Sequence, residues 1–414
     1  MTLSNVTTND SQDLAGLEPG GAVRRSVLPG GVRLLTEHVS GVRSAAIGAW
    51  LPVGSRDEAG GHFGSTHFLE HLLFKGTARR GPLDIAEAFD KVGGEANAAT
   101  AKESTCYYAR VIDQDVPMAV DVLLDMVTGA TLEPVAFETE RGVILEELAM
   151  AGDDPQDVAH EAFAQLVYGD SPLARPIGGT PDTIRAVPRD AVWEHYRQHY
   201  RPDRLVVTAA GNIDHDALAG LVTAALKRGG WDLDPSARPV PRRSTEPQVA
   251  PPAAGGERTL AKPVEQAQVI IGCAGLRAMD PRRHVLAVLS AVLGGGMSSR
   301  LFQEIRERRG LAYSTYSFGG GHADAGSFGL YAGCGPDVAG QVAGLMEAEW
   351  ERMADSGITA EELARAKGQL SGGLVLGLED TFSRMSRLGN AEITAGELPS
   401  LDELLRRIDA VTAR

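Results

Sequence analysis

The stretch STHFLEHLLFKGT, residues 65–77, places two imidazoles and a carboxylate within an otherwise apolar run. Its apolar residues recur at helical spacing and predict a helix over residues 65–74 with one buried face. On such a helix His67 and His71 lie one turn apart, so their side chains project to the same side. Glu70 lies beside them. Burying polar groups without partners is unfavourable, so the presence of these three in an apolar segment indicates that they have a specific role.

Two imidazoles one turn apart can bind a single Zn²⁺ at Zn–N distances of about 2.0–2.1 Å. From the same side, Glu70 would reach a metal-bound water and take its proton as the water attacks a carbonyl. A histidine pair alone is more often a surface or core pair, and His195 and His199 have the same spacing. We interpret that second pair as structural, because no acid lies between its members.

A catalytic zinc site needs a third protein ligand and an open coordination position. The segment ETERGVILEELAM, residues 138–150, lies on a predicted helix over residues 133–149. Its Glu140 and Glu147 are two helical turns apart and share one face among apolar neighbours, where their charge needs a partner. Alone, such a pair would be interpreted as a solvated helix face. The presence of His67 and His71 on another predicted helix favours a role for Glu140 and Glu147 at the metal.

The composition is that of a soluble globular protein, with 43% hydrophobic and 23% charged residues among 414. No apolar run is long enough to cross a membrane, and the first twenty residues have no basic start or apolar core of a secretory signal. We therefore expect a cytoplasmic protein. Its formal net charge of −15 disfavours nucleic acid and anionic membranes as partners. The three cysteines, far apart in sequence, are expected to be reduced.

Composition also divides the chain. Residues 1–22 are expected to form a disordered tail, and residues 232–256, rich in proline and small residues, an inter-domain linker. The linker separates a zinc-binding domain over residues 23–231 from a metal-free domain over residues 257–414, in which the order of predicted strands and helices starts again.

The two halves align without gaps where residues 132–148 fall on residues 358–374. We infer an α+β fold made of two duplicated α/β-layer domains, an internal repeat of about 200 residues. The overlay puts Gly373 where the first half has Glu147, so only the first half carries the polar cluster. A buried strand near residue 213 closes the first half. The second half has no counterpart, and its domain is expected to lack its last strand or to close differently.

Together these motifs resemble the pitrilysin/insulysin metallopeptidases, whose inverted zinc motif is H-x-x-E-H. The similarity is greatest to bacterial homologues of the mitochondrial processing peptidase β subunit, and it spans both halves from about residue 30 to residue 400. The similar stretches are HFLEHLLFKGT, GGEANAATAKESTCYYARV, ERGVILEEL, PLARPIGGT and LGGGMSSRLFQEIRERRGLAYSTYSF.

The resemblance implies roles for the residues of the first half. His67, His71 and Glu147 would bind one Zn²⁺ per chain, and Glu70 would be the general base. Glu140 would orient a ligand histidine from behind.

The resemblance also implies substrate-binding residues. Asn97, Ala98 and Ala99 match an edge strand to which an extended substrate adds by main-chain hydrogen bonds. In the second half, Arg306 and Tyr313 match a pair that reaches the substrate backbone and the developing oxyanion.

Asp157 and Glu161 match acids with which the processing peptidase reads an arginine near the cleavage site. Two carboxylates one turn apart repel each other unless a cation bridges them. The residues leave two interpretations open: recognition of a basic substrate residue, or an ordinary solvated helix face.

The function implied is that of a zinc-dependent endopeptidase, which cleaves unfolded peptides or presequence-like segments in an enclosed chamber of which one chain forms a clam-shell half. Because the chain has its own Arg306 and Tyr313, a homodimer is expected, with a heterodimer with a metal-free homologue as the alternative. A non-catalytic scaffold or partner subunit of the same family is the rival function, and a metal-buffering protein is a weaker third.

Overall fold

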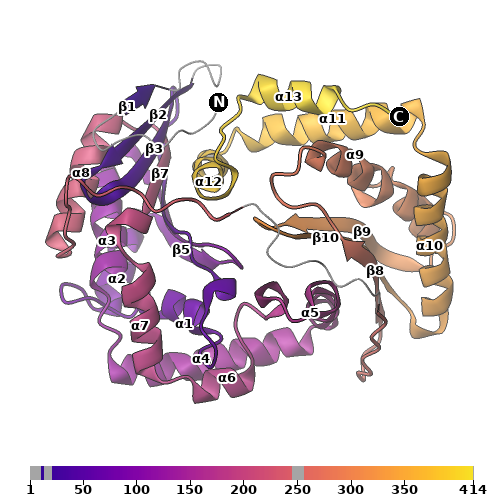
Figure 1. Ribbon diagram of the computed structural model, residues 1–414, viewed down its shortest axis with the longest axis horizontal. Coiled ribbons are helices and arrows are strands. Elements are labelled where there is room, and N and C mark those ends of the chain that lie inside the picture. The colour runs from indigo at the N-terminus through magenta and orange to yellow at the C-terminus, as the bar shows by residue number, and fades with distance from the viewer. Residues whose placement is uncertain (1–10, 14–20, 245–255, 414) are drawn as a thin grey trace. The chain divides into compact units, whose positions relative to one another are not determined.

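The computed structural model describes residues 11–13, 21–244 and 256–413, which form two compact units (Figure 1). Neither unit is continuous in sequence. The first comprises the described residues up to Leu148 together with Pro176–Arg243 and Gly377–Asp402. The second comprises Ala149–Arg175, Ser244–Leu376 and the described residues from Glu403 on.

The first unit is built on a seven-stranded sheet in the order β1-β2-β3-β7-β4-β6-β5. All neighbouring strands are antiparallel except β3 and β7, which are parallel. The strands are β1 (Ser11–Asp13), β2 (Gly21–Leu28), β3 (Val32–Val39), β4 (Ser44–Leu51), β5 (Glu95–Thr100), β6 (Thr105–Ile112) and β7 (Val206–Gly211).

Helices bury both faces of this sheet. Strand β4 shows why, since Ile47 and Leu51 face one apolar cluster and Ala46 and Trp50 face another, as expected from the alternation of side chains along a strand. The helices of this unit are α1 (Ser65–Leu73), α2 (Pro82–Asp90), α3 (Val116–Gly129), most of α4 (Pro134–Asp153), α6 (Pro181–Ala186), α7 (Arg189–His199), α8 (His215–Arg228) and α12 (Thr381–Asn390).

Helix α12 comes from the C-terminal part of the chain and covers one face of the first sheet. Its Met385 and Leu388 are fully buried against a cluster that includes Trp50. The close approach requires glycine at position 389, because a Cβ there would lie 2.3 Å from the Trp50 indole. The following π-helix, Ala391–Ala395, carries Glu392, which is fully buried and paired with Arg25 at 2.9 Å.

The second unit contains a three-stranded antiparallel sheet in the order β8-β10-β9. Helix α5 packs on β8, α9 packs on β9, and α10 packs on β8 and β10. The elements are α5 (Pro155–Tyr168), β8 (Ala267–Ala274), α9 (Arg283–Gly294), a π-helix (Phe302–Glu307), β9 (Ala312–Gly321), β10 (Gly326–Cys334), α10 (Ala339–Ser356), most of α11 (Ala360–Gly377) and most of α13 (Leu401–Asp409).

The two sheets share a repeated motif, in line with the duplication inferred from sequence. Strands β4-β6-β5 of the first unit and β8-β10-β9 of the second have the same antiparallel order. Their hairpins even have the same register, with Thr100 opposite Thr105 and Gly321 opposite Gly326. Each unit therefore contains the same arrangement of three strands. No described strand follows β10.

The division into units differs from the linear boundaries expected from sequence. Helix α4 leads from the first unit into the second, and α11 leads back, so that each unit contains a helix from the opposite half of the chain. The expected linker over residues 232–256 is also shorter than predicted, because Arg243 pairs with Asp57 at 2.7 Å within the first unit. Residues 245–255 lie outside the described part.

The expected N-terminal tail also needs correction. Ser11–Asp13 form strand β1, and Gly21 already begins β2. A polar segment can add to a sheet edge through its backbone alone, which is why apolar periodicity did not reveal it. Residues 1–10 and 14–20 lie outside the described part. Across the described residues, no helix combines the length and apolar character required to span a bilayer.

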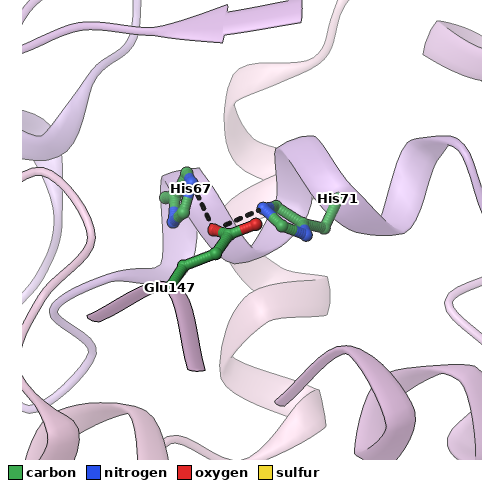
Figure 2. A group of neighbouring side chains, drawn as sticks. All are labelled: His67, His71 and Glu147. Atoms are coloured by element: carbon green, nitrogen blue, oxygen red, sulfur yellow. Dashed lines mark ion pairs between the residues drawn. The ribbon is translucent and has the colours of Figure 1, made fainter. Parts of the chain in front are cut away.

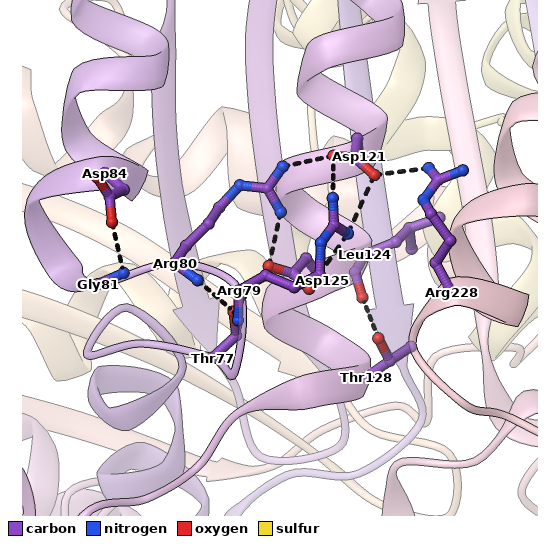
Figure 3. Close-up of polar contacts among 10 residues, drawn as sticks. All are labelled: Thr77, Arg79, Arg80, Gly81, Asp84, Asp121, Leu124, Asp125, Thr128 and Arg228. Carbon is purple, nitrogen blue, oxygen red and sulfur yellow. Dashed lines mark hydrogen bonds and ion pairs between the residues drawn. The ribbon is translucent and has the colours of Figure 1, made fainter.

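An arginine–aspartate cluster fixes the loop that follows α1 (Figure 3). Asp121 on α3 accepts hydrogen bonds from Arg79 at 2.8 Å, from Arg228 at 2.6 Å and from Arg80. The neighbouring Asp125, 3% exposed, accepts one from Arg80 at 2.6 Å. Burial alone would raise the pKa of Asp121, but the three arginine hydrogen bonds outweigh it and hold that pKa well below its usual value.

We predict that Asp121→Asn destabilises the first unit by about 1–3 kcal/mol at neutral pH, since three charge-assisted hydrogen bonds are weakened. The wild-type contribution is present above the unfolded-state pKa of the carboxyl and is lost as pH falls through the lower folded-state value. The stability difference between variant and wild type should therefore shrink below about pH 4. Calorimetric melting at several pH values measures it.

Asp182→Asn is the matched control, because that carboxylate is 97% exposed and has a single ion pair with Arg185. Equal melting temperatures for the two variants at pH 7 would contradict the role given to Asp121.

Candidate metal centre

Helix α1 is held at its first turn by a buried carboxylate. Glu58, 5% exposed, accepts hydrogen bonds from the backbone N–H groups of Gly64 at 2.7 Å and Thr66 at 2.8 Å. These donors have no partner inside a helix, and a negative charge is favoured at this end. The Thr66 hydroxyl also lies 3.1 Å from His195 Nε2. The start of α1 is therefore fixed by contacts that flank His67.

One face of α1 is fully buried, and the opposite one carries the polar cluster. Phe68 and Leu72 are inaccessible to solvent, and Phe68 stacks on Phe137 of α4 with ring centroids 4.3 Å apart. This packing sets α4 against α1. Glu147, three turns along α4 from Phe137, then faces the histidine side of α1.

Figure 2 shows Glu147 between His67 and His71, with its carboxylate directed at both rings. Glu147 Oε2 lies 3.3 Å from His71 Nε2 and 3.7 Å from His67 Nε2. One ligand atom from each residue lies within 4.8 Å of the others, and no other such group of three His, Cys, Asp or Glu residues occurs in the described part of the chain.

The two spacings from Glu147 Oε2 suit a tetrahedral zinc ion. Ligand atoms about 2.1 Å from such an ion are about 3.4 Å from one another, close to both measured separations. Two imidazoles and one carboxylate are also a ligand set that zinc accepts in catalytic sites. Glu147 is 44% exposed and the histidines are 20% and 15% exposed, so one side of the site is open to solvent.

Glu140 supports His71 from behind. Its Oε2 lies 3.1 Å from His71 Nδ1, which leaves Nε2 directed toward Glu147. Glu140 is 3% exposed, and its other oxygen pairs with Lys75 Nζ at 2.9 Å. A carboxylate that accepts the Nδ1 proton fixes the ring orientation and raises the basicity of the ligand nitrogen.

His67 lacks the same support. Its Nδ1 is buried and has no hydrogen-bond partner among the residues that the structure describes. Burial lowers the pKa of His67, the neighbouring His71 lowers it further, and Glu147 opposes the shift. The ring is thus neutral at pH 7, the form in which imidazole binds a metal.

Glu70 points to the edge strand β5. The Thr100 hydroxyl donates a hydrogen bond to Glu70 Oε2. Asn97, Ala98 and Ala99 lie on the same strand, which is the last strand of the described sheet. The Ala98 N–H donates a hydrogen bond to the Asn97 side chain at 2.8 Å. The carboxylate and the strand edge therefore lie next to each other within the first unit.

Arg306 and Tyr313 lie together in the second unit. The Arg306 guanidinium lies 4.6 Å from the Tyr313 ring centroid and donates a hydrogen bond to the Tyr313 carbonyl at 3.1 Å. Tyr313 is 77% exposed. The pair is thus preformed and accessible.

Asp157 and Glu161 are one turn apart on α5 of the second unit. Asp157 is exposed in the first turn, where its backbone N–H is capped by Asp154 at 3.3 Å, and Glu161 is half-buried. An acid in the first turn of a helix also has a structural reason to be there. The geometry leaves both interpretations of the pair open.

His195 and His199 lie in the core of the first unit with ring centroids 4.6 Å apart. Burial lowers the pKa of His195 to about 3 and that of His199 to about 4. They belong to no group of potential metal ligands in the described residues.

Three contributors escaped the sequence analysis: Glu58, Lys75 and Thr100. Lys75 could have been found, since it follows His71 by four residues and lies just beyond the end of α1. Glu58 and Thr100 reach α1 from separate loops and strands, and only the folded chain brings them there.

Comparisons with known proteins identify the family of the chain. Residues 33–181 match a family model described as Insulinase (Peptidase family M16), and residues 186–370 match one described as Peptidase M16 inactive domain. A Streptomyces coelicolor protein named as an uncharacterized zinc protease is 51% identical over 392 residues, covering 95% of this chain and 85% of that protein. The chain belongs to peptidase family M16. The predicted family resemblance and α+β fold are thereby confirmed.

Two further proteins are similar over nearly the whole chain. A Bacillus subtilis protein, also named as an uncharacterized zinc protease, is 38% identical over 395 residues, which are 94% of this chain and 92% of that protein. A crystal structure of a protease from Helicobacter pylori has the same fold, with a TM-score of 0.86 at 21% identity over 95% of this chain and 94% of that one.

We predict that Glu140→Gln weakens zinc binding by about 10–100-fold, because the amide keeps the size of the side chain but loses the charge that polarises His71. Competition with a chelating dye measures the affinity. Glu146→Gln is the matched control, since Glu146 is exposed on the same helix and outside the cluster. If both variants bound zinc equally tightly, Glu140 would have no part in the centre.

Proposed function

We propose that this M16 chain is a zinc-dependent endopeptidase that cleaves unfolded peptides or presequence-like segments. The observation that carries the proposal is the placement of Glu147 Oε2 at 3.3 and 3.7 Å from the Nε2 atoms of His71 and His67. Zinc bound there would lower the pKa of a water ligand and polarise the scissile carbonyl.

The residues of the chain would then perform the proton transfers. Glu70 accepts the proton of the attacking water and passes it to the leaving amine. Thr100 holds the Glu70 carboxylate through its hydroxyl. Glu140 keeps His71 in the tautomer that presents Nε2.

The substrate would bind as an added strand on β5. Asn97, Ala98 and Ala99 lie on the last strand of the described sheet, whose outer edge suits extended chains and discriminates against folded ones. The Ala98 N–H, which donates to Asn97 Oδ1 at 2.8 Å, would exchange that bond for one to the substrate. Arg306 and Tyr313 would complete the reaction site through the substrate backbone and the developing oxyanion. In this proposal two chains pair, as a homodimer or with a metal-free homologue, to enclose the substrate.

A non-catalytic scaffold or partner subunit is the second candidate function. It is favoured by the match of residues 186–370 to a domain described as inactive. The first half nevertheless carries three converging ligand atoms together with Glu70. Metal analysis separates the two candidates: about one Zn²⁺ per chain supports the peptidase, and none supports the scaffold.

We predict that Glu70→Gln retains zinc but loses hydrolysis of a fluorogenic peptide by at least about 10²-fold, because an amide cannot accept the proton of the water. Zinc content and turnover are measured on the same preparation. Glu87→Gln, which changes an exposed residue paired with Lys91 on α2, should match wild type in both. Wild-type turnover by Glu70→Gln would refute the role of Glu70.

A further prediction concerns substrate choice. If Asp157 and Glu161 read a basic residue, replacing both with their amides should lower kcat/KM for an arginine-containing peptide by about fivefold, as expected for a partly exposed ion pair. The same peptide with glutamine in place of arginine should be cleaved by variant and wild type alike. An equal loss on both peptides would assign the pair to helix stability instead.

A further inference from the structure

The turn that joins β5 to β6 is held by the loop of residues 54–58, which precedes α1 in the first unit. The Ser55 N–H donates a hydrogen bond to the Ala101 carbonyl at 3.2 Å. The two segments pack so closely that a Cβ at position 54 would lie 2.3 Å from the Ala101 carbonyl oxygen, so glycine is required there. The 54–58 loop therefore fixes the end of the β5–β6 hairpin.

The same loop holds the start of α1. Its Glu58 accepts a hydrogen bond from the Thr66 N–H at 2.8 Å, and its Gly54 carbonyl accepts one from the Thr66 hydroxyl at 3.4 Å. The hairpin reaches α1 at a second point, where the Thr100 hydroxyl donates to the Glu70 carboxylate. The loop, the helix and the hairpin thus form a closed set of contacts that includes Glu70.

One arginine joins the loop to the hairpin through their side chains. Arg243 Nη2 lies 2.7 Å from both carboxylate oxygens of Asp57 in the 54–58 loop. Its Nε lies 3.4 Å from Glu103 Oε1 in the turn between β5 and β6. Arg56 pairs with the same Glu103 oxygen at 2.6 Å. The guanidinium of Arg243 therefore bridges two carboxylates that belong to different segments.

Arg243 comes from a distant part of the sequence, and its own position is fixed. It ends the Pro176–Arg243 segment of the first unit. The preceding Arg242 donates hydrogen bonds to the Glu392 carbonyl at 2.6 Å and to its carboxylate at 2.9 Å. Asp57 and Glu103 are half-buried, so the charge-assisted bonds of the bridge are partly shielded from water.

We propose that Arg243 is a positioning residue for the peptidase reaction. By binding Asp57 and Glu103 together, it holds the β5–β6 hairpin against the loop before α1, and Thr100 at the end of β5 then keeps the Glu70 carboxylate in place. This inference rests on the proposed function, in which Glu70 accepts the proton of the attacking water.

The contacts predict which property of the protein changes when the bridge is lost. Without the guanidinium, the carboxylates of Asp57 and Glu103 are no longer joined by a cation, and the turn can move away from the loop. The candidate zinc ligands are positioned by the packing of α1 on α4, in which the hairpin has no part. Loss of Arg243 should therefore disturb the proton transfer and leave the metal in place.

Kinetics of the full-length protein with a fluorogenic peptide test the inference. Arg243→Gln should lower kcat, expressed per bound Zn²⁺, about tenfold, because a small displacement of the base slows the reaction steeply. KM and zinc affinity should stay within about twofold of wild type. Arg243→Lys, which keeps the charge, should recover most of the loss. Arg238→Gln changes an exposed arginine of the same segment and should match wild type.

A second variant tests whether Arg243 acts through Asp57. Asp57→Asn should give the same kinetic split, and the double variant should lose no more than about twofold beyond the weaker single variant, since both changes break one bridge. Asp57→Asn also keeps the inference testable if Arg243→Gln does not fold.

Hydrogen exchange followed by mass spectrometry supplies a measurement that needs no activity. In Arg243→Gln, amides of the 54–58 loop should exchange faster than in wild type, because the Ser55 N–H bonds to the turn, while amides of α4 should be unchanged.

The inference is overturned if wild type hydrolyses the peptide and Arg243→Gln matches it, if zinc affinity falls along with kcat, or if Arg243→Lys is as slow as Arg243→Gln. If wild type itself shows no turnover, the proposed function fails, and the exchange of the 54–58 loop alone decides. Unchanged exchange in Arg243→Gln would then refute the role of the bridge.

Discussion

The structure of the candidate centre depends on the packing of two helices against each other through aromatic rings. Phe68 of α1 stacks on Phe137 of α4, and this contact positions the polar side chains of the two helices relative to each other. It brings Glu147 to the imidazoles and Glu140 to His71 Nδ1. The core thereby decides the geometry of the polar cluster. Glu58 adds a second constraint, since it fixes the end of α1 from which His67 projects.

Much of this arrangement could be predicted from sequence, because it depends on local spacing. His67, Glu70 and His71 share one helical segment, and Glu140 and Glu147 share another, so helical geometry alone placed each group on one face. The prediction that the two groups come together relied on coordination chemistry, because a catalytic zinc site needs a third protein ligand. The family comparison then confirmed the fold, while the individual roles remain predictions.

The parts that sequence missed are those that depend on contacts between distant segments. No periodicity indicates that α12 covers the first sheet, because its apolar face is equally suited to any other core. The pairing of Glu392 with Arg25 spans 367 residues and is likewise invisible before folding. Strand β1 was not predicted for a different reason: its segment has no apolar periodicity, and it joins the sheet through its backbone.

The exchange of α5 and α12 between the halves has a consequence for biosynthesis. The three candidate ligands are complete once residue 147 has left the ribosome, but the sheet of the same unit lacks its cover until α12 follows more than 230 residues later. The apolar surface around Trp50 stays uncovered during that interval. Assembly of the first unit, which carries the candidate centre, is therefore tied to completion of almost the whole polypeptide.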